Sequence, residues 1–244
     1  LGWGDPGVAF TAVIQLGSIL AVLAYFRTDL ADVISGMSRA FRYGQWKDPS
    51  ARLGLAILVG TVPIVLGGMA LKLWVDDYES SVLRSMTSIA IVSIVMALLL
   101  ALAEVLGRRR RQLSDVAPAD GVLVGLAQAL ALVPGVSRSG STLTAALLDG
   151  WQRPAAARFS FLLGIPAITL AGLVELKEAV STPSNGGVVP MALGVISAAI
   201  VSWLAIAWLL RFLQRHSTWV FVGYRLVFGA VILLWFRALD AAGS

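Results

Sequence analysis

Residues 119–150 read ADGVLVGLAQALALVPGVSRSGSTLTAALLDG, an apolar run that is interrupted by Pro134, Gly135 and Gly140 and carries several hydroxyl side chains. Proline removes a backbone donor and glycine loosens the chain, so one continuous helix is excluded. The pattern predicts a helix that ends just before the proline, a polar turn, and a second short helix from about residue 141 to 149.

Long apolar blocks surround this stretch on both sides. Of the 244 residues, 58% are hydrophobic and 14% are charged, whereas an ordinary soluble domain has roughly 25% charged residues. About twenty helical residues cross the hydrocarbon core of a bilayer, which is roughly 30 Å thick. The blocks lie at 8–26, 54–74, 85–106, 157–176, 190–213 and 218–236. The sequence therefore predicts an all-α polytopic membrane protein with six transmembrane helices.

The connecting segments separate by charge. Most arginines and lysines between the spans lie in segments 27–52, 107–120 and 211–217, which the positive-inside rule assigns to the cytoplasmic face. The acidic connection with Asp76, Asp77 and Glu79 is then external. The net charge of +5 is explained by this orientation, and we expect no nucleic-acid partner. Because both flanking spans end on the cytoplasmic side, segment 119–150 is predicted to be a re-entrant helical hairpin.

The span count also predicts an internal symmetry. We treat 1–244 as a single membrane domain with halves 1–118 and 119–244, each with three spans. Because three is odd, successive halves must cross the membrane in opposite orientation, which is an inverted-topology repeat.

The turn of the hairpin has the composition of an anion site. Backbone that is not helical at membrane depth must be buried in protein or line a cavity. The motif PGVSRSGST at 134–142 places Arg138 among the hydroxyls of Ser137, Ser139, Ser141 and Thr142, at the start of a helix. A guanidinium binds two phosphate oxygens at once, and a helix N-terminus favours anions. In the alternative, Arg138 pairs with a neighbouring acid and the serines only cap the helix.

This motif resembles the second signature of the BacA-type undecaprenyl-diphosphate phosphatases. Three further stretches look like other parts of that family: DPGVAFTAVIQLGSILAVLAYF at 5–26, FSFLLGIPA at 159–167, and the pair Tyr224 and Arg225. The resemblance therefore covers essentially the whole chain.

The resemblance implies an activity and a place for it. Members of the family hydrolyse undecaprenyl diphosphate to the monophosphate in the bacterial cytoplasmic membrane, at a site open to the outer side. The reaction recycles the lipid carrier for peptidoglycan synthesis and gives resistance to bacitracin. The expected partners are the polyprenyl diphosphate and membrane lipids, and a homodimer is left open.

The same resemblance assigns roles to residues. Arg138 would hold the diphosphate as a catalytic residue, with hydrogen bonds from Ser137, Ser139 and Thr142. Substrate-binding roles fall to Gly135, Gly140, Ser141 and Gln128. For Gln128, a hydrogen bond that packs two helices together is an equal alternative.

One part of the family pattern has no match here. The family has a first signature on a re-entrant hairpin, with paired glutamates, a proline, serines and a histidine, and we expect it to precede Leu1. The resemblance implies a divalent cation, Mg²⁺ or Ca²⁺, whose ligands we place in that upstream segment, so no metal ligand is assigned in this chain. The lone His216 lies in a basic loop and is not assigned a catalytic role.

Two questions stay open at this stage. Inverted repeats with half-helices aimed at an anion are also found in transporters, so a transporter or flippase of polyprenyl phosphate or another anion is the alternative function. Arg225 lies about seven residues into the last span, and we expect it to pair with a carboxylate, first of all Glu104. The run Arg108–Arg111 is read as a topology determinant that could also bind anionic head groups.

Overall fold

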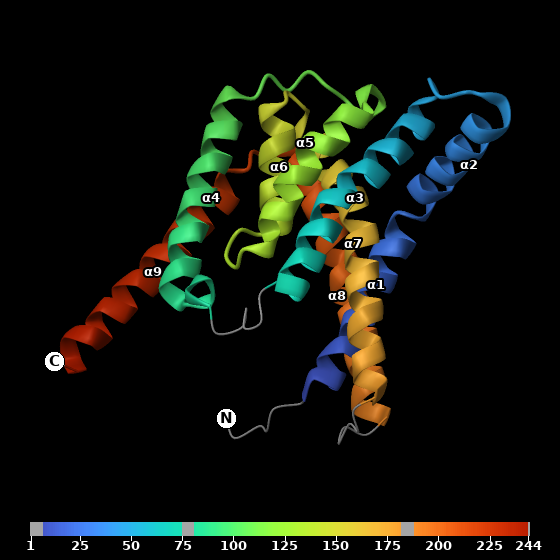
Figure 1. Ribbon diagram of the computed structural model, residues 1–244. Helices are drawn as coiled ribbons and strands as arrows, with labels where there is room; N and C mark the ends of the chain where they lie inside the picture. Colours follow the sequence, from blue (N-terminus) through green and yellow to red (C-terminus); the bar gives the residue numbers. More distant parts are fainter. Residues whose placement is uncertain (1–6, 75–80, 182–187, 244) are drawn as a thin grey trace.

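The chain folds into a bundle of helices (Figure 1). The computed structural model describes residues 7–74, 81–181 and 188–243. The helices are α1 (Gly7–Tyr25), α2 (Arg27–Tyr43), α3 (Pro49–Trp74), α4 (Met86–Leu106), α5 (Pro118–Ala129), α6 (Arg138–Leu148), α7 (Arg153–Ser181), α8 (Val188–Arg215) and α9 (Trp219–Gly243), with single turns η1 (Val82–Arg84), η2 (Leu113–Asp115) and η3 (Leu130–Leu132). Within these ranges there is no β-strand. The acidic connection 76–79 lies outside the described residues.

The predicted spans are confirmed as helices. Five of them, α3, α4, α7, α8 and α9, are long and apolar enough to cross a bilayer. The first block forms α1, which continues into α2 with a bend of 65°, and this bent pair is the sixth candidate span. The protein is therefore a multi-pass helical membrane protein. The inverted repeat stays a prediction. Helices from the two halves do pack side by side, with α4 beside α9 and α1 beside α7.

Segment 27–52, which we expected to be a cytoplasmic loop, is mostly helix α2. Most of its side chains are exposed or partly exposed, and only Gly36 and Ala40 are buried. The helix ends at Gly44, whose φ of 69° is the left-handed conformation that commonly closes a helix. Asp48 then accepts a hydrogen bond of 2.7 Å from Arg39. Helix α2 packs on α3, so the connection is a helical extension of the bundle.

The re-entrant hairpin is confirmed, with α5 and η3 leading in and α6 leading back (Figure 1). It packs against α3 through residues that lack side-chain bulk. A Cβ atom at Gly121 would lie 2.2 Å from the carbonyl oxygen of Ala56, and one at Gly125 would lie 2.3 Å from that of Gly60. Small residues of this kind let two helices meet backbone to backbone, and here they fix the hairpin beside α3.

The second half-helix begins earlier than predicted, at Arg138 and not at Ser141. The reason is a cap: Ser137 Oγ accepts a hydrogen bond of 3.3 Å from the backbone N–H of Gly140. Eleven residues make α6 about 16 Å long at 1.5 Å per residue, roughly half of a hydrocarbon core. The turn that precedes it therefore lies about halfway along the bundle.

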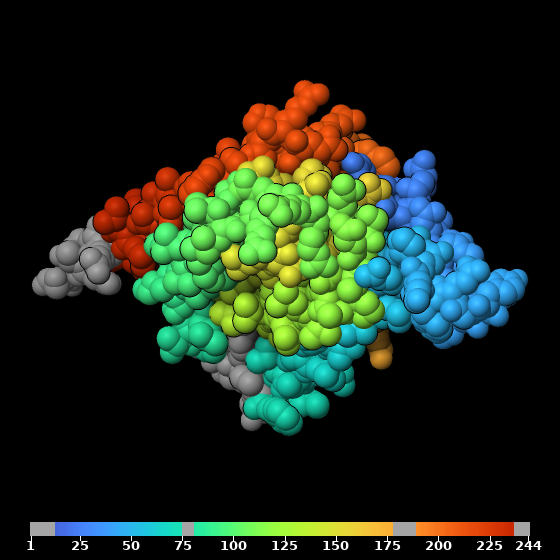
Figure 2. All heavy atoms as spheres, turned by 90° about the horizontal axis from the view of Figure 1, so that it is seen from above, coloured from blue at the N-terminus to red at the C-terminus, as the bar shows by residue number. Residues whose placement is uncertain are grey.

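Polar contacts join the ends of several helices at one face of the bundle. Figure 2 shows this face, with segment 107–120 near its centre. Buried Glu104 accepts hydrogen bonds from Arg153 Nε at 3.0 Å and Thr218 Oγ1 at 2.7 Å, and it also pairs with Arg109. The ends of α4, α7 and α9 are thereby tied together. The expected pairing of Glu104 with Arg225 was wrong, because these other groups already occupy the carboxylate.

Candidate functional site

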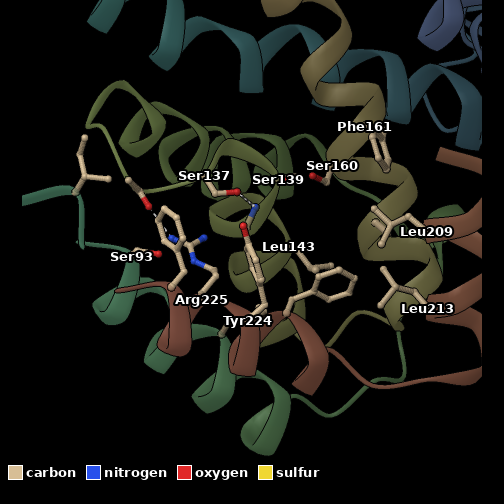
Figure 3. Close-up of a pocket in the computed structure, with 17 residues that line it drawn as sticks. Ser93, Ser137, Ser139, Leu143, Ser160, Phe161, Leu209, Leu213, Tyr224 and Arg225 are labelled. Atoms are coloured by element: carbon tan, nitrogen blue, oxygen red, sulfur yellow. Dashed lines mark hydrogen bonds between the residues drawn. The ribbon is translucent and has the colours of Figure 1, made fainter. Parts of the chain in front are cut away.

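A cavity of about 370 Å³ lies between the hairpin turn and helices α4, α7, α8 and α9 (Figure 3). Its two ends differ in chemistry. Ser93, Ser137 and Arg225 lie toward one end, and Phe161, Leu209 and Leu213 lie toward the other, with Ser160 beside Phe161. The polar wall consists of Ser93, Ser137, Ser139, Ser160, Tyr224 and Arg225, with the backbone of Gly135 and Gly140.

Arg225 is the cation in the wall of this cavity. Its Nη2 donates to the carbonyl oxygen of Gly135 at 2.6 Å, and its Nη1 donates to that of Val136 at 3.0 Å. Its buried Nε–H has no hydrogen-bond partner, and no carboxylate pairs with the guanidinium within the described residues. The expected ion pair with a carboxylate is therefore replaced by hydrogen bonds to two backbone carbonyl groups of the turn, and the guanidinium forms part of the cavity wall.

Ser137 lies opposite Arg225 and is held in an unusual conformation. Its φ of 65° is rare for a residue other than glycine, and such strain often marks a functional turn. The turn also needs Gly135, whose φ is 90° and whose Cβ would lie 2.6 Å from the carbonyl oxygen of Ile89. Ser139 follows in the first turn of α6 and is exposed to the same cavity.

Arg138 points to the other side of α6. Its Nη1 donates to the carbonyl oxygen of Gly164 at 3.1 Å, and its guanidinium lies so close to Gly164 that a Cβ there would be 2.9 Å from Nη1. No carboxylate pairs with Arg138 within the described part of the chain, so the alternative of a simple ion pair is not found there. The capping alternative is correct for Ser137.

The other hydroxyls of the motif are buried behind the wall. Thr142 Oγ1 lies 2.5 Å from Ser160 Oγ and donates to the carbonyl oxygen of Arg138 at 2.9 Å. Ser141 Oγ donates to the same carbonyl oxygen at 2.9 Å. We expected Ser137, Arg138 and Thr142 to face a common cavity, and only Ser137 does so. Thr142 reaches the wall indirectly, through Ser160.

Gln128 is completely buried, and neither atom of its amide group has a hydrogen-bond partner among the described residues. The packing hydrogen bond that we considered for it is absent there, and Gln128 does not line the cavity. His216 is also outside the cavity: its ring stacks on Phe212 with centroids 4.4 Å apart.

Three residues of the wall were not predicted. Ser160 and Tyr224 lie in stretches that carry the family resemblance, but no local pattern around them indicates a role. Ser93 is a single hydroxyl within an apolar span. A polar side chain at that depth is a signal in itself, because it usually faces the interior of the bundle.

The described residues do not fit a divalent cation. They contain no group of three His, Cys, Asp or Glu side chains that could hold a metal ion. The residues in the cavity wall include neither a carboxylate nor an imidazole. No step of the reaction is therefore assigned to a cation.

The fold and the site define a multi-pass helical membrane protein that has a cavity at the tip of a re-entrant hairpin, with the arginine Arg225 in the cavity wall. Residues 1–231 match the family described as bacitracin resistance protein BacA, so the chain belongs to this family. It is 67% identical over 236 residues to an undecaprenyl-diphosphatase of Parasynechococcus marenigrum (strain WH8102), covering 96% of this chain and 82% of that protein. It is 70% identical over 232 residues to one of Synechococcus sp. (strain RCC307), covering 95% and 81% respectively.

Proposed function

We propose that the cavity at the hairpin tip is where this protein hydrolyses undecaprenyl diphosphate to undecaprenyl phosphate and phosphate. The activity is the one after which relatives 64–70% identical to it are named. It recycles the lipid carrier for peptidoglycan synthesis and gives resistance to bacitracin. The observation that carries the location is the guanidinium of Arg225, which has no paired carboxylate among the described residues and lies opposite Ser137 in the cavity wall.

The two ends of the cavity suit an amphiphilic substrate. The diphosphate is expected at the polar end, and the first prenyl units are expected along the apolar wall of Phe161, Leu209 and Leu213. An apolar wall stabilises hydrocarbon by about 25 cal/mol for each Å² that it removes from water. A water-soluble diphosphate lacks this contribution, so the lipid form is the preferred substrate.

The groups around the turn can stabilise charge on the phosphoryl oxygens. Phosphoryl transfer depends mainly on positioning and electrostatic stabilisation, since charge spreads over these oxygens in the transition state. Arg225, the hydroxyls of Ser137 and Ser139, and the N-terminus of α6 converge on the polar end. Overall, water supplies the hydroxyl that the terminal phosphorus gains, and the bond from that phosphorus to the bridging oxygen breaks.

We keep Arg138 and Thr142 as catalytic candidates beside Ser137 and Ser139. Arg138 makes a side-chain hydrogen bond to Gly164, and its guanidinium has five N–H donors in all, so further donors remain for a phosphate. Thr142 supports the wall through Ser160. Gly135, Gly140, Ser141 and Gln128 are proposed as substrate-binding or supporting residues. Gln128 is the weakest of them, because it is completely buried and lies outside both the cavity wall and the motif 134–142.

The cellular setting is also part of the proposal. The arginine-rich segment 107–111 is placed on the cytoplasmic side of a bacterial cytoplasmic membrane, and the site opens to the outer side. The family resemblance implies a divalent cation, which chelation with EDTA and readdition of Mg²⁺ or Ca²⁺ would test. Loss and recovery of phosphate release would support it.

A direct test of the proposed role of Arg138 is its substitution in the full-length protein. Lysine keeps the charge but lacks the planar fork that contacts two oxygens. We expect Arg138→Lys to lower phosphate release by about 10²-fold, the scale of losing one preorganised donor, and Arg138→Ala to be worse. Arg110→Gln, in an exposed position at the opposite end of the hairpin, is the control and should stay near wild type. Near wild-type release by a folded Arg138→Ala variant would refute this assignment.

A further inference from the structure

One arginine holds both outer ends of the re-entrant hairpin. Arg111 Nη2 donates to Asp120 Oδ2 at 2.5 Å, and Nη1 donates to Asp120 Oδ1 at 3.1 Å, in the first turn of α5. The same Nη1 also donates to Oδ2 of Asp149, the residue that caps the end of α6. A single guanidinium therefore bridges the point where the hairpin begins and the point where it ends.

Further contacts fix this bridge in place. The buried Trp151 donates from Nε1 to Asp149 Oδ2 at 2.9 Å, and the Arg111 guanidinium carbon lies 5.3 Å from the centre of the Trp151 ring. The backbone N–H groups of Arg110 and Arg111 donate to the carbonyl oxygen of Gly150 at 2.8 and 3.0 Å. We call Arg111, Asp120, Asp149 and Trp151 the base clasp.

The arginine run divides into inward and outward side chains. Arg109 and Arg111 turn inward, to Glu104 and to the base clasp respectively. Arg108 and Arg110 are exposed, and within the described part of the chain no carboxylate binds their side chains. Because the four residues are adjacent and carry the same charge, the outward pair supplies matched controls for the inward pair.

We propose that Arg111 is a positioning residue, which sets the place of the catalytic turn by holding the two ends of the hairpin together. The proposal rests on the proposed function, since the turn must be the site. Arg111 acts along α6, a single helix from Arg138 to Leu148 with Ser137 at one end and Asp149 at the other. A shift of the clasped end is therefore passed on to the turn.

Without Arg111 the hairpin ends would repel each other. The carboxylates of Asp120 and Asp149 bond the same nitrogen, so removal of the guanidinium leaves two like charges close together in a partly buried position. Like charges at such a site destabilise the charged forms and favour separation. A misplacement of about 1 Å far from the reacting atoms can cost about 10²-fold in rate.

The test compares Arg111→Gln with the matched control Arg110→Gln in the full-length protein purified in detergent. We expect Arg111→Gln to lower kcat at least about 10-fold, while KM changes far less because the apolar wall is untouched. Arg110→Gln should keep both constants. If Arg111→Gln does not fold, Arg111→Lys and Trp151→Phe carry the test, since each weakens the base clasp without removing the whole contact. Wild-type kcat in the folded variants would overturn the proposal.

A double-mutant cycle with Arg138→Lys separates positioning from a loss of folded protein. If Arg111 acts through the turn, the double variant should be less impaired than the product of the two single effects. Multiplicative effects would mean that Arg111 acts independently of the turn, which contradicts the proposal. A wild-type rate for Arg225→Lys, at the arginine of the cavity wall, would count against the proposed site itself. A slow Arg225→Lys beside a normal Arg111→Gln would remove only the positioning role.

Discussion

A methyl group at position 140 would disturb the contact between the hairpin and Arg225 without replacing either Arg225 or Ser137. A Cβ at Gly140 would lie 2.8 Å from Arg225 Nη1 and 3.2 Å from Ser137 Oγ, whereas ordinary contacts begin at 3.4 Å. The guanidinium would therefore have to withdraw by about 0.6 Å, a displacement of the size that costs preorganised sites their rate. Its bonds to the carbonyl oxygens of Gly135 and Val136 would lengthen or break.

The stability of the fold should change little in Gly140→Ala. The nearest atom is the end of a flexible side chain, so the cost of overpacking should be at the low end of about 1–3 kcal/mol. Alanine is favoured over glycine within a helix by up to about 1 kcal/mol, which offsets this cost. We expect a nearly unchanged free energy of unfolding, with phosphate release lowered by about 10- to 10²-fold.

The assay is phosphate release from a prenyl diphosphate by the purified full-length protein, with thermal unfolding measured on the same sample. Gly223→Ala is the control, because position 223 lies two residues before Arg225 in α9 and a Cβ there meets nothing within 4 Å. The control should match wild type in both measurements. Wild-type phosphate release by Gly140→Ala would refute the role of Arg225 in the cavity.

Three further substitutions test other contacts of the site. Gly164→Ala places a Cβ 2.9 Å from Arg138 Nη1, and by moving that guanidinium it should lower phosphate release about 10-fold. An unchanged rate would argue that Arg138 does not act from this position. Arg225→Lys loses the fork that holds Gly135 and Val136, so thermal unfolding should show a loss of about 1–3 kcal/mol, and phosphate release should fall by about 10²-fold. Glu104→Gln leaves Arg109 and Arg153 without their buried carboxylate and should destabilise the protein by about 3 kcal/mol. An unchanged melting temperature would contradict the role of Glu104 in joining α4, α7 and α9.

The architecture could be predicted from the sequence because each membrane helix is encoded locally. A block of apolar residues of sufficient length forms a helix whatever its neighbours do, and the proline and glycine at 134–135 interrupt such a block. Helix α2 was not predicted, because the search for apolar blocks does not find an amphipathic helix. The predicted start of α6 at Ser141 is three residues late, because capping by Ser137 was considered only as an alternative to a binding role and was not used to place the helix.

The site could be predicted only in part because it is built from separate helices. The turn itself supplies Ser137, Ser139, Gly135 and Gly140, which one motif contains. The direction of Arg138 depends on where α7 presents the carbonyl group of Gly164, and the partner of Arg225 depends on how α9 meets the turn. No local pattern encodes these distances. Ser93 and Ser160 reach the cavity for the same reason, through the packing of α4 and α7.

The backbone contact between α3 and α5 determines which parts of the protein can move. With no side chain between Gly121 and Ala56, or between Gly125 and Gly60, the two helices have no layer that could deform and let one slide past the other. Any motion that admits or releases a lipid must therefore carry α3 and the hairpin together as one rigid body. Side-chain bulk added at any of these four positions would act as a wedge and displace the hairpin turn from outside the cavity.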